Sequence, residues 1–274
     1  MMLTGFAAVV RRTPMIPIKS RREIEKMRRA GAIVGDLLEE FRGWIAPGVT
    51  TEELDRKAEE FIRGRGGRAS FKGYRGFPAS ICTSLNEEVV HGIPDKRVVR
   101  TGDIVSVDVG VEFDYYHGDS ARTFAVGAVS PRIEALLAAG EGSLRDALAI
   151  AGPGVRLWEV SAAIESHVCS RGFSIVKQYV GHGIGRNLHE EPQIPNYVER
   201  SNQRSNTLLK PGMTLAIEPM VNAGGEEVRV LDNGWTVVTV DRSWSVHFEH
   251  TILITETGIE ILTMAGLSRS QERR

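Results

Sequence analysis

Apolar residues in the first part of the chain repeat with the spacing of two amphipathic helices. The first stripe consists of Ile24, Met27, Val34, Leu38 and Phe41. Ser20 and Glu23 form the sequence of a capping box in front of this stripe, and Pro47-Gly48 is expected to end the helix. A second helix is expected from about Thr51 to Arg63, and its stripe consists of Leu54, Ala58, Phe61 and Ile62.

Farther along, apolar and polar residues alternate as they do in a strand. The segment Asp103-Ile-Val-Ser-Val-Asp-Val places its apolar residues on one face and Asp108 near its end. Residues 1–19 show no clear periodicity and contain Pro14 and Pro17. We therefore expect a peripheral N-terminal extension at 1–19, one folded domain at 20–266 and a polar C-terminal tail at 267–274.

The two halves of the chain repeat one pattern. The segment Pro47-Gly-Val-Thr-Thr-Glu-Glu-Leu recurs as Pro153-Gly-Val-Arg-Leu-Trp-Glu-Val, at an offset of 106. At an offset of 110, the strand segment that ends in Asp108 recurs in the segment that ends in Glu218. A weaker match pairs His117-Gly-Asp with His247-Phe-Glu. Two similar halves folded face to face around a pseudo-twofold axis predict an α/β architecture with antiparallel strands inside and helices outside.

This arrangement would bring four carboxylates into one cleft, namely Asp108, Asp119, Glu218 and Glu249. Repulsion and desolvation would raise their pKa values or unfold the site unless a cation lay among them. Two divalent metal ions about 3.5–4 Å apart would resolve this conflict. A neutral imidazole would complete the ligand set, and His182, between two glycines, is the natural candidate. Oxygen-rich ligands with one nitrogen suit Mn, Fe, Co or Zn.

Each acidic residue also has a simpler interpretation. Asp108 could end a strand in solvent, Asp119 could belong to a turn, and Glu249 could occupy an exposed strand position. Glu218 is different because it lies between the apolar segments Leu215-Ala-Ile and Pro219-Met-Val. A carboxylate there is better explained as a ligand or a paired charge, so the group as a whole favours a metal site.

Composition narrows the class of protein. Lys and Arg number 34 against 35 Asp and Glu, and this balance gives no argument for a nucleic-acid partner. The two cysteines, Cys82 and Cys169, form no CxxC motif, which excludes a disulfide scaffold and favours a reducing compartment. No apolar run approaches the ~20 residues of a membrane span. We therefore expect a cytoplasmic protein that requires neither nucleic acid nor membrane.

Eight short motifs resemble those of the type I methionine aminopeptidases, in order and with fitting spacings from about residue 20 to 264. They are Gly73-Tyr-Arg-Gly-Phe-Pro, Asn86-Glu-Glu-Val-Val-His-Gly-Ile-Pro, His117-Gly-Asp-Ser, Gly181-His-Gly-Ile-Gly, His189-Glu-Glu-Pro, Ala216-Ile-Glu-Pro-Met, Gly234-Trp-Thr-Val-Val-Thr and Glu249-His-Thr. The resemblance implies a pita-bread fold, in which helices surround a central curved antiparallel sheet, for a catalytic domain at 20–266. It implies metal-dependent removal of the initiator methionine from nascent proteins when the second residue is small.

The resemblance also implies roles for the site residues. Asp108 would chelate one metal ion, Asp119 and Glu249 would bridge two, and His182 with Glu218 would hold the second. A metal-activated water would attack the scissile carbonyl, and Glu218 would shuttle its proton to the leaving amine.

Six further residues would contact the substrate if the resemblance holds. His91 and His189 would contact the peptide and the tetrahedral intermediate, although a lone histidine is more often a structural hydrogen-bonding group. The methionine side chain would lie among Tyr74, Phe77, Cys82 and Trp235, which could otherwise be ordinary core residues. Phe71 and Leu188 depart from the residues of some relatives and leave the shape of this pocket open.

The expected partners are the N-termini of nascent polypeptides, with the ribosome as a place of encounter, and the expected state is a monomer. Two alternatives remain. An X-Pro aminopeptidase or prolidase of the same fold usually carries a sizeable N-terminal domain, which 19 residues cannot supply. A catalytically silent pita-bread binding protein would typically have lost metal ligands, whereas all five candidates are present here.

Overall fold

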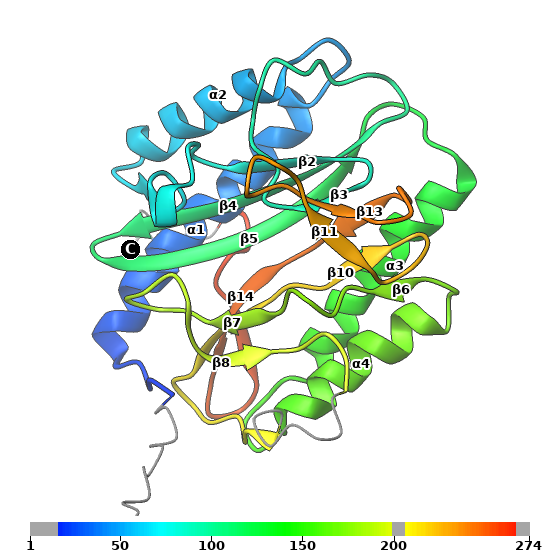
Figure 1. The fold of residues 1–274 in the computed structure, drawn as a ribbon. Coiled ribbons are helices and arrows are strands. Elements are labelled where there is room, and N and C mark those ends of the chain that lie inside the picture. Colours follow the sequence, from blue (N-terminus) through cyan, green and yellow to red (C-terminus); the bar gives the residue numbers. More distant parts are fainter. Residues whose placement is uncertain (1–15, 199–205, 267–274) are drawn as a thin grey trace, which may run out of the picture.

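The computed structural model describes residues 16–198 and 206–266, in which helices alternate with antiparallel strands (Figure 1). The helices are α1 (Arg21–Trp44), α2 (Thr51–Gly64), the short 3-10 helix η1 (Tyr74–Gly76), α3 (Pro131–Ile150) and α4 (Leu157–Cys169). The strands of the first half are β1 (Arg68–Ala69), β2 (Cys82–Leu85), β3 (Glu88–Val90), β4 (Ile104–Phe113) and β5 (Tyr116–Ala125). The strands of the second half are β6 (Ser174–Ile175), β7 (Gly181–Gly183), β8 (Glu190–Ile194), β9 (Thr214–Ile217), β10 (Met220–Asn222), β11 (Val228–Val230), β12 (Val237–Thr239), β13 (Ser245–His247), β14 (His250–Ile254) and β15 (Ile259–Ile261).

Both predicted helices are confirmed, and each begins at a capping box. The Glu23 carboxylate accepts a hydrogen bond from the backbone N–H of Ser20 at 2.7 Å, and Glu53 accepts one from Thr50 at 3.0 Å. These contacts satisfy N–H groups that have no partner within the first helical turn. The predicted stripes face the core, where Phe41 of α1 and Leu54 of α2 are fully buried.

The internal repeat of the sequence is also a repeat of structure. The backbone N–H of Gly48 donates to the carbonyl of Val99, and the N–H of Gly154 donates to the carbonyl of Leu209, both at 2.9 Å. These pairs are related by the same offsets of 106 and 110 residues. Gly48 and Gly154 both adopt positive φ angles, of 99° and 84°, which glycine tolerates without steric cost.

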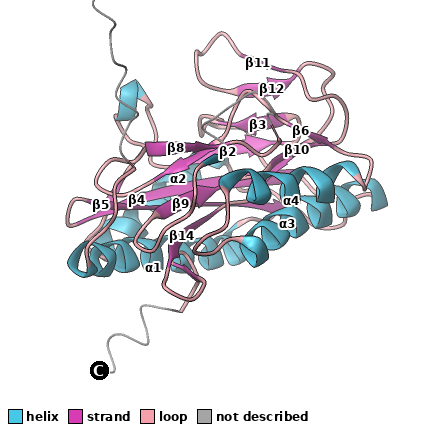
Figure 2. Ribbon diagram, turned by 90° about the horizontal axis from the view of Figure 1, so that it is seen from below, coloured by secondary structure: helices cyan, strands magenta, loops and turns pink. Residues whose placement is uncertain are grey.

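The two halves meet where β5 runs beside β14. The backbone N–H of Asp119 donates to the Thr251 hydroxyl at 3.0 Å, and that of Glu249 donates to the carbonyl of Ala121 at 2.9 Å. The strand pairs are antiparallel, and helices α1, α3 and α4 lie along one side of them (Figure 2). The predicted fold class is therefore confirmed.

Strand β4 differs from its prediction because it is longer and is buried on both faces. Val105 and Val107 pack in the core with α1 and α2, as the alternation predicted. The other face carries Ser106, which is buried and shares a hydrogen bond of 2.8 Å with Thr123. The second half of the molecule covers this polar face, and the short alternating segment could not indicate that contact.

The part of the predicted N-terminal extension that the structure describes contacts the folded body. The Lys19 ammonium is buried and pairs with Glu190 Oε2 at 2.5 Å. Residues 1–15 and 267–274 lie outside the described residues, so the proposed boundaries of the extension and the tail stay predictions. None of the described helices is both long enough and apolar enough to cross a membrane.

We expect Gly31→Ala to destabilise the fold. A Cβ at this position of α1 would collide with the backbone carbonyl oxygen of Leu262, and neither backbone can move freely. Overpacking of this kind typically costs about 1–3 kcal/mol. The matched control is Gly43→Ala on the same helix, where a Cβ meets no atom within 4 Å and should be neutral or stabilising by up to about 1 kcal/mol. Urea unfolding measures both, and an equal effect of the two changes would contradict the assigned packing.

Candidate metal centre

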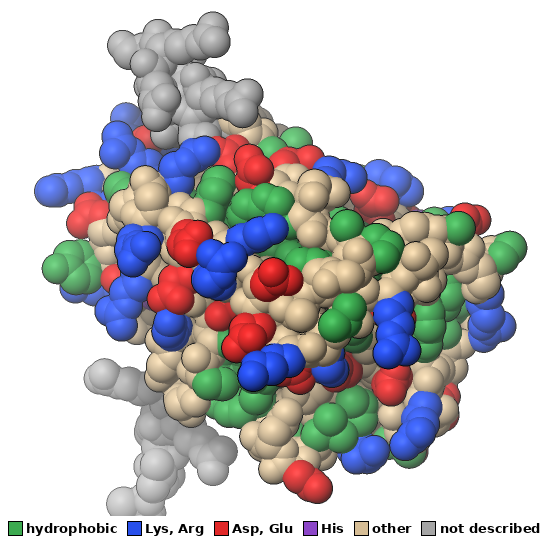
Figure 3. All heavy atoms as spheres, turned by 90° about the horizontal axis from the view of Figure 1, so that it is seen from above, with side chains coloured by type: hydrophobic (Ala, Val, Ile, Leu, Met, Phe, Trp, Pro, Cys, Tyr) green, Lys and Arg blue, Asp and Glu red, His purple; other side chains and the backbone are tan. Residues whose placement is uncertain are grey.

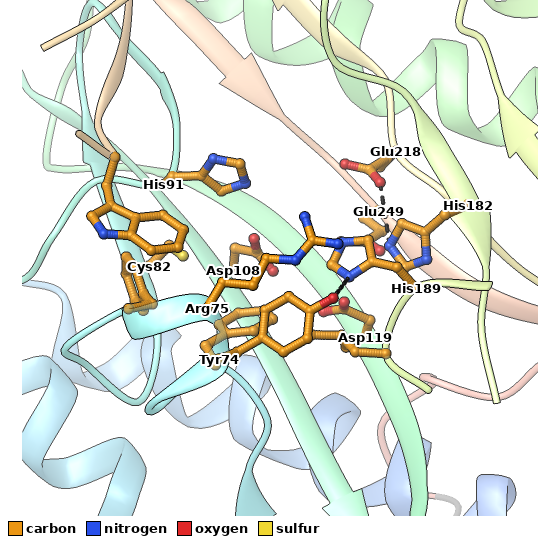
Figure 4. Close-up of a pocket in the computed structure, with 14 residues that line it drawn as sticks. Tyr74, Arg75, Cys82, His91, Asp108, Asp119, His182, His189, Glu218 and Glu249 are labelled. Atoms are coloured by element: carbon orange, nitrogen blue, oxygen red, sulfur yellow. Dashed lines mark hydrogen bonds and ion pairs between the residues drawn. The ribbon is translucent and has the colours of Figure 1, made fainter. Parts of the chain in front are cut away.

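A cavity of about 130 Å³ contains every residue that the sequence analysis placed in the site (Figure 4). Its lining consists of Phe71, Tyr74, Arg75, Phe77, Cys82, His91, Asp108, Asp119, His182, Leu188, His189, Glu218, Trp235 and Glu249. These residues come from both halves of the chain. The cavity therefore exists only because the halves fold face to face.

The four acidic residues and the histidine are held by strands or by the residues next to strands. Asp108 lies in β4, Asp119 in β5 and His182 in β7. Glu218 directly follows β9, and Glu249 directly precedes β14. Because β9 pairs with both β7 and β14, and β14 lies beside β5, the hydrogen-bonded strands fix the spacing of these side chains.

Three of these side chains lie close enough to share a metal ion. One ligand atom from each of Asp119, His182 and Glu249 lies within 4.8 Å of the others. His182 Nε2 is 3.6 Å from Glu218 Oε1, and His182 Nδ1 is 2.9 Å from the carbonyl of Gly183. A proton on Nδ1 would satisfy that carbonyl and leave the Nε2 lone pair directed at the cluster, the usual arrangement of a ligating histidine.

The buried carboxyl groups of the cluster have raised pKa values, which a bound cation would lower. Burial raises the pKa of Asp108 and of Glu218 to about 7. Burial and the neighbouring carboxylates raise the pKa of Asp119 and of Glu249 well above the usual range. One oxygen of each of Asp108, Asp119 and Glu249 is buried without a hydrogen-bond donor among the described residues. Divalent cations would satisfy these oxygens and favour the ionised carboxylates, so the donor set fits a metal centre.

Two other histidines of the cavity are neutral at physiological pH. Burial lowers the pKa of His91 to about 4, and burial together with His182 lowers the pKa of His189 to about 3. The Tyr74 hydroxyl lies 2.9 Å from His189 Nδ1, and the two rings stack with their centroids 5.3 Å apart (Figure 4). His91 has a φ of 58° and packs edge-on against Trp235. Neutral rings held in this way can donate or accept a hydrogen bond.

The remaining lining is mostly apolar. Phe77 and Trp235 meet edge to face with centroids 5.1 Å apart. Cys82 is buried, and this burial raises the pKa of its thiol well above the usual value, so the thiol is a packing group and not a nucleophile. Leu188 and Phe71 are buried in the same cluster, so both of the noted departures lie in the pocket wall.

Sequence reasoning missed three residues that adjoin the site. Arg75 lines the cavity from the turn between Gly73 and Gly76, with a φ of 49°, and no local pattern indicated its direction. The side-chain amide of Asn196 donates to the backbone carbonyl of Glu218 at 3.0 Å. His247 lies two residues before Glu249, and this strand-like spacing could have placed both on one face.

Metal-stripped protein is expected to lose stability as the pH rises from 6.5 to 8. The pKa values of Asp108 and Glu218, about 7 in the fold, exceed the roughly 4 of unfolded carboxyls, so the folded state binds more protons. The free energy of unfolding therefore falls as the pH passes through 7, by on the order of 2 kcal/mol. Histidines with lowered pKa values, such as His91, act in the opposite direction, mainly below pH 6.5.

Chemical denaturation with and without Mn²⁺ measures this effect, because the difference between the two forms cancels groups remote from the metal. The stabilisation by Mn²⁺ should grow across the window. A stabilisation that stays constant or shrinks would contradict the proposed protonation of the cluster.

Comparison with known proteins identifies the family. The profile of Metallopeptidase family M24 matches residues 25–256. The chain is 53% identical over 249 residues to methionine aminopeptidase 1 of Bacillus subtilis, covering 91% of this chain and 99% of that protein. It is 47% identical over 251 residues to the methionine aminopeptidase of Escherichia coli K12, and the match covers 91% of this chain and 94% of that protein.

Solved structures agree with this result. The methionine aminopeptidase of Thermotoga maritima superimposes with a TM-score of 0.88 at 48% identity, covering 91% of this chain and 100% of that one. The prolidase of Pyrococcus furiosus shares the fold at 24% identity and a TM-score of 0.71, and the match covers 65% of its length. Membership of this family implies divalent metal ions as cofactors. The chain belongs to metallopeptidase family M24, in the branch of the bacterial type I methionine aminopeptidases.

Proposed function

We propose that this chain is a hydrolase that removes the initiator methionine from nascent proteins when the second residue is small. The observation that carries the proposal is the juxtaposition of two features in one cavity. One is the buried group of four carboxylates and His182, and the other is the apolar wall that contains Phe77 and Trp235. The apolar wall suits a thioether, which makes favourable contacts with aromatic edges. Relatives matched over nearly their whole length carry the corresponding name.

We propose that two divalent ions, of Co, Mn, Fe or Zn, occupy the centre. Asp108 would hold one ion, Asp119 and Glu249 would bridge both, and His182 with Glu218 would hold the other. When bound, such ions supply Lewis acidity that lowers the pKa of a water and polarises the scissile carbonyl. The spacing of ligand atoms within 4.8 Å supports this assignment.

Glu218 is suited to move a proton during the reaction. Its carboxyl group is buried at the cavity beside His182, and in the metal-free protein burial raises its pKa to about 7. The proposed metal ions would favour its ionised form, which can accept a proton. Glu218 would accept a proton from the attacking water and deliver it to the leaving amine, while its backbone carbonyl is held by Asn196.

His91 and His189 are suited to contact the peptide. If the Tyr74 hydroxyl donates to His189 Nδ1, the ring proton lies on Nε2 and can be donated to the oxygen that becomes negative. Neutral imidazoles can donate to the peptide without adding a positive charge beside the metal ions. We assign both residues to substrate binding and stabilisation of the tetrahedral intermediate.

The cavity and the molecular surface bear on the oligomeric state and the binding partners of the chain. The cavity is complete within a single chain and so needs no partner, and we propose a monomer with residues 20–266 as the catalytic domain. On the face shown in Figure 3, basic and acidic side chains are interspersed, which gives no continuous basic surface for a nucleic acid. We place the reaction in the cytoplasm, where nascent N-termini emerge from the ribosome.

The direct test is hydrolysis of peptides by metal-stripped protein before and after addition of Mn, Fe, Co or Zn. We expect metal-dependent cleavage of Met-Gly peptides and none of Met-Leu, Leu-Gly or Ala-Pro peptides. Glu218→Gln should lower kcat on Met-Gly by about 10²–10⁴-fold through loss of the proton shuttle. Cleavage confined to Ala-Pro would move the protein to the X-Pro group, and inactivity with every metal would favour a binding protein.

Tyr74→Phe should lower kcat/KM and leave the proposed metal ligands in place. The change removes the hydroxyl that orients His189 Nδ1 and keeps the stacked ring. Loss of one such hydrogen bond is worth about 1 kcal/mol, or roughly fivefold in kcat/KM. The control is Tyr115→Phe, because Tyr115 is 66% exposed and lies outside the cavity. If wild type and Tyr74→Phe have equal kcat/KM, the Tyr74 hydroxyl does not orient His189 for catalysis.

A further inference from the structure

The Glu218 carboxylate lies between two imidazoles. His182 Nε2 is 3.6 Å from Glu218 Oε1, and His247 Nε2 is 3.5 Å from Glu218 Oε2. His247 is only 2% exposed and is not among the residues that line the cavity. A peptide in the pocket is therefore out of its reach, and Glu218 is the acidic side chain that its ring approaches within 4 Å.

His247 Nε2 is an unused polar atom in this environment. It is fully buried and finds no hydrogen-bond partner at normal distance among the described residues. Leaving such a group unpaired is costly, so a role for it requires a partner that approaches more closely in the working enzyme. The nearest carboxylate oxygen is Glu218 Oε2, and a shift of about half an ångström would bring the pair within hydrogen-bond distance.

The backbone around His247 is firmly held. Its N–H donates to Thr123 Oγ1 at 2.9 Å, and its carbonyl accepts from the same hydroxyl at 3.0 Å. In the sheet, His247 of β13 is paired with Met220 of β10, two residues beyond Glu218. The backbone of His247 is thus paired with the strand that begins two residues after Glu218, so a small movement of the side chains is enough to close the gap between the ring and the carboxylate.

We propose that His247 is a positioning residue of the metal centre, whose Nε2–H holds Glu218 Oε2 and leaves Oε1 for the metal ion shared with His182. The inference rests on the proposed function, because it assumes that Glu218 is a ligand. A ligating carboxylate with its second oxygen held in this way keeps one orientation, and partners of this kind strengthen metal binding. We do not assign His247 as a ligand, because it does not line the cavity in which the five proposed ligands meet.

Comparison of the two halves of the internal repeat shows that only the second half places a histidine beside its carboxylate in this way. The sequence pairs His117-Gly-Asp with His247-Phe-Glu, so His117 is the counterpart of His247. His117 Nδ1, however, lies 2.9 Å from Ser70 Oγ, so this ring already has a hydrogen-bond partner away from the acidic cluster. Asp108, the counterpart of Glu218, thus has no equivalent support from His117. The asymmetry fits a Glu218 that must hold a metal ion and also handle a proton.

The test compares His247→Gln with His247→Leu by calorimetric titration of Mn²⁺ into metal-stripped protein. The glutamine amide can still donate to Glu218, so its metal affinity should stay within about threefold of wild type. Leucine fills similar space without a donor, so the weaker metal site should lose about 10–100-fold. His167→Leu is the matched control, because His167 is a buried imidazole that pairs with Asp146 outside the cavity.

The affinities of the two His247 variants for Mn²⁺ decide whether the proposal holds. Unchanged affinity in both His247 variants would overturn the proposal, and so would equal losses in both, because the ring would then be required for another reason. A wild type that binds no metal would instead contradict the proposed function itself.

A second measurement covers the case in which His247→Leu does not fold. Ring ¹⁵N NMR of wild-type protein loaded with diamagnetic Zn²⁺ should show a protonated Nε2 for His247, assigned by its absence in His247→Gln. An unprotonated or zinc-bound Nε2 would contradict the proposal.

Discussion

The burial of four carboxyl groups in one cavity is the constraint on which the rest of the structure depends. Asp108 and Asp119 come from the first half and Glu218 and Glu249 from the second, and burial raises the pKa of each. Burying these groups together lowers the stability of the fold unless a cation binds among them, so metal binding is expected to stabilise the folded state. The same desolvation that is unfavourable without metal would strengthen every interaction with a metal-activated substrate.

The duplicated architecture explains how such a cluster is assembled. Each half brings a strand that carries a carboxylate to the interface. The segments before these strands are held by equivalent backbone hydrogen bonds, from Gly48 to Val99 and from Gly154 to Leu209. In the proposed mechanism, the catalytic roles are divided unequally between the two halves. The first half contributes His91 and most of the apolar wall, whereas the second half contributes His182, His189 and the supported Glu218.

Local pattern predicted the parts of the fold that local physics controls. Helix α1 was predictable because Ser20 and Glu23 cap an apolar stripe, and the repeat placed Asp108 opposite Glu218 before any contact was known. Long-range contacts were not predictable in this way. The inward direction of Arg75 depends on a left-handed turn, and the buried pair of Lys19 with Glu190 joins residues 171 positions apart. Substrate roles for residues such as His91 came from the resemblance alone, since a single histidine has no pattern of its own.

The most direct measurement is anomalous X-ray scattering from crystals soaked in Mn²⁺. We expect two manganese peaks about 3.5–4 Å apart. Asp119 and Glu249 should bridge the peaks, with Asp108 at one ion and His182 and Glu218 at the other. A single peak, no peak, or ions bound away from these five side chains would contradict the proposed metal centre.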